Sequence, residues 1–150
     1  MEKLTKAKCD VNMLSPLNLA FIGDTVFDLF VREKLVCEAN RPVSKLHNKA
    51  AGMVKASAQA RAVERIKDKL SEQEQNVIRR GRNAHVNHKA KNMSEADYHL
   101  ATGLEALFGY LYLKGETDRL NEIFDKDCTK IAHKLMCLKD ILCATMISTS

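Results

Sequence analysis

The chain has 150 residues, of which 45% are hydrophobic and 29% charged, and its formal net charge is +5. This composition is that of an ordinary globular domain and excludes an intrinsically disordered chain. No apolar run approaches the roughly 20 residues that a membrane span needs, and the first residues lack the apolar stretch of a secretion signal, so we expect a cytoplasmic protein without membrane contact. The positive charge suits a polyanionic partner, although many proteins that bind none share it.

The first half of the chain carries helix signals and no alternating strand pattern. Ser15 followed by Pro16 predicts a helix over residues 16–34, because serine caps a helix and proline suits its first position. After the breaker "CEANRP", the chain is rich in Ala, Lys, Arg and Gln, which predicts one long helix over residues 43–70.

The middle of the chain holds a short predicted helix and then a loop. Ser71 and Glu74 have the spacing of a capping box, which predicts a helix through "EQEQNVIRR" that ends at Gly81. Residues 81–93, "GRNAHVNHKAKNM", show no apolar period. We therefore expect a polar, basic loop there.

Two further helices are predicted in the second half. Ser94 can cap a helix over "EADYHLATGLEALFGYLYLK", which Gly115 should end. Thr117 can cap a last helix over residues 118–136, in which apolar residues fall at helical spacing. The chain as a whole is expected to form a single all-α domain.

Two carboxylates stand out within apolar stretches. Asp24 lies in "LNLAFIGDTVFDLF" and Glu105 in "LEALFGYLYL", so we expect both to be buried. An isolated buried carboxylate is strongly unfavourable, and a salt bridge to Arg or Lys would relieve that cost. A divalent cation between the two helices would relieve it as well, because Mg²⁺ takes one or two carboxylates and leaves positions for water and phosphate oxygens. Gly103 and Gly109 predict the close helix approach that such sharing needs.

The two acidic segments together resemble the catalytic helices of the ribonuclease III family. "LAFIGDTVFDLF" is similar to the signature helix of that family, and "ATGLEALFGYLYL" is similar to its second catalytic helix, in the same order and at a matching separation. "RRGRNAH" followed by "KAKN" resembles the Mini-III branch, which has the catalytic domain without a double-stranded-RNA-binding domain. The resemblance covers roughly residues 14–135.

This resemblance implies a fold and an activity. The fold is an all-α, ribonuclease III-like helical endonuclease domain, expected over residues 1–138, with a C-terminal tail of ambiguous pattern over residues 139–150. The activity is Mg²⁺-dependent hydrolysis of double-stranded RNA by a homodimer, which leaves 5′-phosphate and 3′-hydroxyl ends. The Mini-III branch further implies maturation of the 23S ribosomal RNA precursor, and an assisting ribosomal protein is a further candidate partner.

The resemblance also assigns roles to individual residues. Asp24 matches the signature-helix aspartate and Glu105 the metal-binding glutamate, so both are implied to be catalytic and to bind Mg²⁺. Phe21 matches an aromatic that inserts across the dimer interface in relatives. Ala20 and Thr102 stand where longer ribonucleases III carry acids, a loss that the Mini-III branch shares. We therefore expect at least one Mg²⁺ per site, without a full two-metal clamp.

Basic residues beside the two acidic helices are candidate RNA contacts, because A-form RNA is recognised through its phosphates and 2′-hydroxyls. On the predicted long helix a solvated charged face explains them equally well, whereas the density of charge around the loop favours RNA. The candidates are Lys45, His47, Lys49 and Lys55 on the helix and Arg79, Arg80, Arg82, Asn83, His85, Lys89 and Lys91 around the loop.

Two other functions compete with an endoribonuclease. A non-catalytic RNA-binding or ribosome-associated protein on the same fold is the alternative, and a helical protein-interaction domain is a third interpretation. Asp24 and Glu105 in apolar surroundings favour the enzyme, since a binding module has no use for them. The basic loop beside the acids disfavours the interaction domain.

Overall fold

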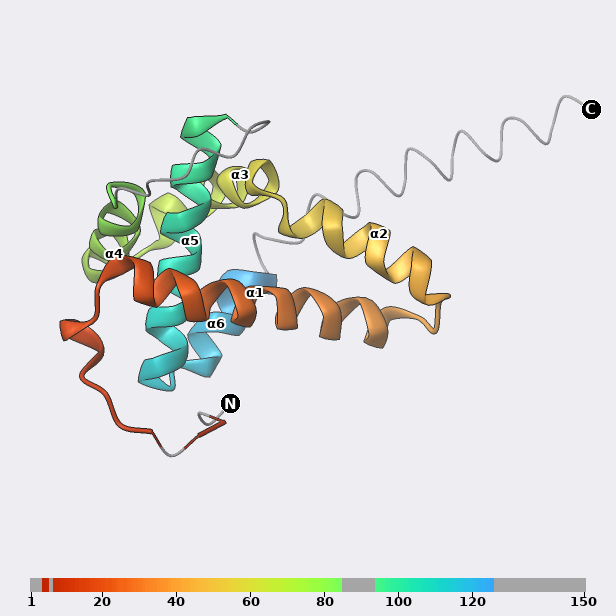
Figure 1. Cartoon of the computed structure of the whole chain (residues 1–150), viewed down its shortest axis with the longest axis horizontal. Helices are drawn as coiled ribbons and strands as arrows, with labels where there is room; N and C mark the ends of the chain where they lie inside the picture. The colour runs from red at the N-terminus through yellow and green to blue at the C-terminus, as the bar shows by residue number, and fades with distance from the viewer. Residues whose placement is uncertain (1–3, 6, 85–93, 126–150) are drawn as a thin grey trace, which may run out of the picture.

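The computed structural model describes residues 4–5, 7–84 and 94–125. These residues form helices and no strand, which confirms the predicted all-helical fold (Figure 1). The α-helices are α1 (Pro16–Glu38), α2 (Val43–Val54), α3 (Ala56–Ile66), α4 (Glu72–Arg82), α5 (Glu95–Lys114) and α6 (Thr117–Ile123), and the 3-10 helices are η1 (Val11–Met13) and η2 (Lys67–Lys69). Most of the predicted loop, the predicted extension of the last helix and the tail 139–150 lie outside the described residues.

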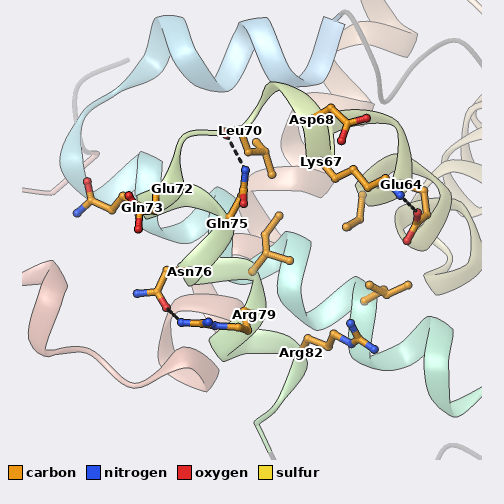
Figure 2. A pocket seen from close by; sticks show the side chains of 13 residues that line it. Glu64, Lys67, Asp68, Leu70, Glu72, Gln73, Gln75, Asn76, Arg79 and Arg82 are labelled. Carbon is orange, nitrogen blue, oxygen red and sulfur yellow. Dashed lines mark hydrogen bonds and ion pairs between the residues drawn. The ribbon is translucent and has the colours of Figure 1, made fainter.

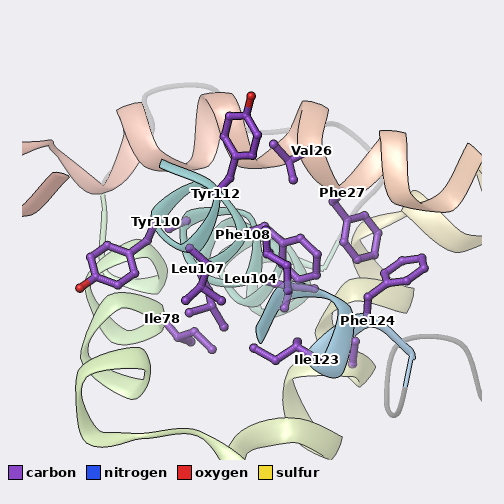
Figure 3. Packing of buried hydrophobic residues seen from close by; sticks show 14 of the residues in the cluster. Val26, Phe27, Ile78, Leu104, Leu107, Phe108, Tyr110, Tyr112, Ile123 and Phe124 are labelled. Carbon is purple, nitrogen blue, oxygen red and sulfur yellow. The ribbon is translucent and has the colours of Figure 1, made fainter. Parts of the chain in front are cut away.

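Helix α5 is the centre of the fold. Almost every residue from Ala101 to Tyr112 is buried, and α1, α3, α4 and α6 all pack against it. A helix that is apolar on nearly all sides has to be surrounded in this way. Figure 3 shows Leu107 and Phe108 of α5 in the core, with Ile78 and Ile123 contributed by α4 and α6.

Packed phenylalanine rings join the end of α6 and the second half of α1 to the core. The ring centroids of Phe27 and Phe108 lie 5.1 Å apart, and those of Phe30 and Phe124 lie 5.2 Å apart, both pairs edge to face. Such pairs contribute about 0.5–1.5 kcal/mol each beyond their buried area. Each ring of one pair also meets a ring of the other, so the four rings form one cluster.

Helices α1 and α5 touch backbone to backbone where they cross. A Cβ atom on Gly23 would overlap the carbonyl oxygen of Glu105 and lie 2.7 Å from the backbone nitrogen of Gly109. A Cβ atom on Gly109 would overlap the carbonyl oxygen of Leu19. Neither position has room for any side chain, so this crossing depends on both glycines.

Gly103 does not take part in that crossing, contrary to the prediction. It packs on α4, where an added Cβ would lie 2.9 Å from the carbonyl oxygen of Ile78, and Gly81 meets it from the other side of the contact. Gly103 and Gly109 are six residues apart, about 240° around a helix, so they face different neighbours. Helix α5 therefore has two close crossings, one with α1 and one with α4.

The predicted long helix over residues 43–70 is interrupted, so that prediction was wrong. Lys55 has an extended backbone, with φ −63° and ψ 145°, and separates α2 from α3. The residues before and after Lys55 in the sequence have a high helix propensity. The two halves of the segment pack on different helices, however: α2 packs on α1, and α3 packs on α5. The chain bends at Lys55 because one straight helix could not reach both partners.

The capping box of α4 is confirmed. The backbone N–H of Ser71 donates to Glu74 Oε2 at 2.8 Å, and the backbone N–H of Glu74 donates to Ser71 Oγ at 3.3 Å. Arg119 of α6 donates two further hydrogen bonds to the Glu74 carboxylate, at 2.8 and 2.9 Å. The helix runs on to Arg82 instead of ending at Gly81, because Gly81 belongs to the contact with α5.

The ends of the remaining helices follow the predictions with small differences. Helix α1 continues four residues past the predicted end, and Ser94 occupies the cap position of α5 without a capping hydrogen bond. Gly115 ends α5 with a positive φ of 77°, as predicted. Thr117 is the first residue of α6 and not its cap. None of the helices in the described ranges combines the length and apolar character of a membrane span.

The crossing of α1 and α5 can be tested with alanine. Gly109→Ala should lower the free energy of unfolding by about 3 kcal/mol or more, because its Cβ meets backbone that cannot move aside. Gly52→Ala is the matched control: nothing lies within 4 Å of an added Cβ there. Gly52→Ala should instead raise the free energy of unfolding by about 0.5–1 kcal/mol, because alanine favours a helix more than glycine does. Urea denaturation measures both; equal effects would contradict the backbone contact.

Candidate acidic site at the crossing of helices α1 and α5

Asp24 and Glu105 lie close together at the helix crossing. Asp24 directly follows Gly23, and the backbone of Gly23 packs on the backbone of Glu105. The two side chains are near enough for the charge of Asp24 to raise the pKa of Glu105. The structure therefore brings together the two acids that the sequence singled out.

The two acids differ in burial. Glu105 is half-buried, but Asp24 is exposed, and the expectation that it would be buried was wrong. Helix α1 buries one stripe, which includes Leu19, Gly23 and Val26. Asp24 lies at the edge of this buried face, one turn after the buried Ala20, where its side chain is still open to solvent. The apolar composition of the segment did not reveal this, because exposed apolar residues also lie on α1.

Glu105 has a perturbed pKa. Burial is the main cause that raises this pKa, and the charge of Asp24 raises it further. The side-chain amide of Gln59 lowers it in part, and the pKa of Glu105 is about 7. Among the described residues neither Asp24 nor Glu105 forms an ion pair, so the salt-bridge alternative finds no basic partner there. Asp28, one turn after Asp24, pairs with Arg32 at 2.6 Å.

The donor set of the pair, two carboxylates, is one that Mg²⁺ takes. No group of three His, Cys, Asp or Glu side chains suited to a metal ion occurs in the described ranges. Ala20 and Thr102 are buried, and the Thr102 hydroxyl donates to the Tyr98 carbonyl at 3.0 Å. Two carboxylates without a cationic partner fit Mg²⁺, which keeps several waters.

The candidate RNA contacts fall into two groups on either side of the acids. The first, around α2, consists of the exposed Lys45, His47 and Lys55 and the half-buried Lys49. The second, at the end of α4, consists of the exposed Arg79, Arg80, Arg82 and Asn83. His85, Lys89 and Lys91 lie outside the described residues. Helix α4 packs near the start of α1 and α2 packs along its second half (Figure 1).

Phe21 is 84% exposed, which is unusual for a large apolar side chain. Leu17, one turn earlier on α1, is exposed as well. Met13 is also exposed, but it belongs to η1 and is separated from α1 by the extended residues Leu14 and Ser15. Leu17 and Phe21 therefore form an exposed apolar stripe at helical spacing on α1, and contiguous exposed apolar surface marks interaction sites.

A pocket of about 1190 Å³ lies elsewhere, between α3, η2 and α4 (Figure 2). Its polar side chains mostly bond to protein groups: Lys67 to Glu64, Arg79 to Asn76, and Gln75 to the Leu70 carbonyl. Charges of both signs line it, and neither Asp24 nor Glu105 does. It is separate from the acidic site.

Comparison with known proteins identifies the family of this chain. The Ribonuclease III domain family matches residues 17–116. A Mini-ribonuclease 3 of Thermoanaerobacter is 51% identical over 124 residues, 83% of this chain and 86% of the relative, and that of Clostridium tetani is 44% identical over 81% and 80%. The chain belongs to the Mini-ribonuclease 3 branch of the ribonuclease III family. It is therefore an endoribonuclease.

Structural comparison supports the fold. A crystal structure of a protein from Fusobacterium nucleatum superposes with a TM-score of 0.71 at 25% identity, covering 79% of this chain and 96% of that one. Together with the family match, this confirms the ribonuclease III-like fold.

Gln59 is a residue of this ribonuclease III domain that the sequence analysis did not single out. It lies on α3 beside Glu105, within the buried stripe formed by Ala56, Ala60 and Val63. A helical projection of "ASAQARAVERI" would have shown one amide among apolar residues, which is a signal for closer inspection.

The raised pKa of Glu105 predicts a pH-dependent stability. A folded-state pKa of about 7, against an ordinary value of 4.5, means that ionised Glu105 destabilises the folded metal-free protein. This cost grows as pH rises from about 4.5 to 7 and is complete above that. Glu105→Gln should therefore raise the free energy of unfolding at pH 8 in EDTA by about 1–3 kcal/mol, and much less at pH 5.

Asp24→Asn is the control for this experiment. Asp24 is exposed, so its substitution should change the free energy of unfolding less than that of Glu105 does. Denaturant titrations at both pH values measure the two effects. A Glu105→Gln variant that is less stable than the parent protein at pH 8 would contradict the unfavourable burial of Glu105.

Proposed function

We propose that this endoribonuclease cleaves double-stranded RNA in a Mg²⁺-dependent reaction at Asp24 and Glu105. One observation carries the proposal. Two carboxylates approach each other at a backbone-to-backbone helix crossing and have no ion-pair partner among the described residues. A protein retains such an unfavourable pair where a cation compensates it, and relatives named Mini-ribonuclease 3 support a cation that serves RNA cleavage.

Asp24 and Glu105 have different tasks in this proposal. Glu105 is half-buried and positioned by the packed centre of α5, so it forms the rigid side of the site. Asp24 is exposed, so it forms the side that an RNA phosphate can approach. Bound Mg²⁺ would supply an activated water and charge stabilisation for the leaving oxygen.

The two basic groups fit an extended RNA duplex. They lie toward opposite ends of α1, with the acids between them. A duplex that follows α1 would place its phosphates near both groups while its scissile bond faces Asp24. Contacts of this kind recognise the shape of A-form RNA and not its sequence.

We also propose a homodimer, which the exposed stripe of Leu17 and Phe21 on α1 supports. The exposed face of α1 that carries Phe21 also carries Asp24, so a second copy docked on the stripe would set two acidic sites on one side of the assembly. A dimer doubles the basic surface along the RNA, which strengthens phosphate binding.

The substrate we propose is the precursor of 23S ribosomal RNA, cleaved in the cytoplasm to leave 5′-phosphate and 3′-hydroxyl ends. The proposal derives from the resemblance to the Mini-III branch. The catalytic domain would extend over residues 1–138, and a ribosomal protein bound to the precursor would be an assisting partner.

A cleavage assay tests the proposed activity. The protein is incubated with a 23S precursor transcript and with a generic RNA duplex, with Mg²⁺ or with EDTA. We expect cleavage only with Mg²⁺, and a loss on the order of 100-fold or more in Asp24→Asn and Glu105→Gln, which equals roughly 2.7 kcal/mol of transition-state stabilisation. Asp28→Asn is the matched control, because Asp28 lies on the same helix in an ion pair.

Different failures have different meanings in this assay. RNA binding without cleavage by the parent protein would contradict the enzymatic proposal. Cleavage retained in both acid variants would contradict the assigned site. Cleavage of the generic duplex alone would contradict the precursor as substrate.

The homodimer is tested by sedimentation. Phe21→Ala should raise the dissociation constant of the dimer at least tenfold over that of the parent protein, because a buried aromatic anchor contributes about 2 kcal/mol or more. Val36→Ala, an exposed apolar residue farther along α1, is the control and should leave the dimer unchanged. A monomeric parent protein, or equal effects of both variants, would contradict the interface.

A further inference from the structure

Gln59 has an unusual environment for an amide side chain. It is 1% exposed, on the face of α3 that packs against α5. Neither its Oε1 nor its Nε2 atom makes a hydrogen bond to any group in the described part of the chain. Buried amides of folded proteins nearly always have partners, so this one calls for an explanation.

Stability does not provide that explanation. The neighbouring residues of the same stripe, Ala56, Ala60 and Val63, are apolar and buried. An apolar side chain of similar volume would fit these surroundings without leaving polar atoms unsatisfied, and would be neutral or more stable. The amide is therefore a cost to the metal-free fold.

Glu105 is the acceptor that the amide can reach. Gln59 lies on the face of α3 that packs against α5, near enough to interact with the side chain of Glu105, but the two side chains do not meet in full hydrogen-bond geometry. The Nε2 atom of Gln59 can donate to Glu105 while Oε1 remains available to accept from a water. A bound cation keeps Glu105 ionised, and an ionised carboxylate is the stronger acceptor.

We propose that Gln59 is a positioning residue of the acidic site, whose hydrogen bond to Glu105 closes when a cation is bound and holds that carboxylate in the direction of Asp24. This proposal rests on the function proposed above. Residues behind metal ligands commonly orient them in this way, and their loss typically weakens metal binding about 10–100-fold. Gln59 would act through Glu105 without touching the cation.

Metal affinity and stability together test the proposal. Isothermal titration with Mn²⁺ in the absence of RNA gives the dissociation constant, and thermal unfolding in EDTA gives the midpoint. Gln59→Met should raise the Mn²⁺ dissociation constant by about tenfold, equal to roughly 1.4 kcal/mol, while the unfolding midpoint stays equal or rises. A purely structural glutamine would show the reverse, a lower midpoint and unchanged affinity.

Gln75→Met is the matched control. Gln75 donates to the Leu70 carbonyl at 3.0 Å and lies in the pocket of Figure 2, away from the acids. It should keep the parent Mn²⁺ affinity and lower the midpoint. If Gln59→Met fails to fold, Gln59→Leu gives the same readings.

The outcomes separate this proposal from the proposed function. Unchanged Mn²⁺ affinity in folded Gln59→Met, or a parent protein that binds no Mn²⁺ at Asp24 and Glu105, would overturn the role of Gln59. Mn²⁺ binding that weakens in Gln59→Met would support it even if the parent protein cleaved no RNA, a result that would overturn only the nuclease assignment.

Discussion

The backbone contact between α1 and α5 at Gly23 and Gly109 is the constraint on which the rest of the structure depends. It brings two helix axes closer than any side chain would allow. Because Asp24 follows Gly23 and Glu105 lies one turn before Gly109, the same contact sets the distance between the two acids. The remaining helices then pack around α5 and keep this crossing in place.

Features that disfavour folding gather beside this crossing. Glu105 is partly buried next to another acid, and Gln59 is buried without a hydrogen-bond partner in the described chain. Elsewhere local rules are obeyed, as in the capping box at Ser71 and the aromatic cluster around Phe108. Natural proteins tend to violate such rules at functional sites, where binding of a ligand compensates the cost.

Signals that act over a few residues could be predicted from the sequence, whereas long-range geometry could not. The caps at Ser15 and Ser71 and the left-handed Gly115 depend on local chemistry and were confirmed. The bend at Lys55 depends on which partner each half of the segment packs against. Asp24 and Glu105 stood out as acids in apolar stretches and then matched a family pattern, but the exposure of Asp24 depends on its place at the edge of the face that α1 buries.

The most direct test of this account is the anomalous diffraction of Mn²⁺ in crystals of the parent protein, grown without phosphate and soaked in the ion. The account predicts one anomalous peak between the carboxylates of Asp24 and Glu105, at a ligand distance of about 2.0–2.3 Å from an oxygen of each. Absence of a peak from this position at a saturating Mn²⁺ concentration, or a peak that contacts only one of the two acids, would contradict a cation shared across the helix crossing.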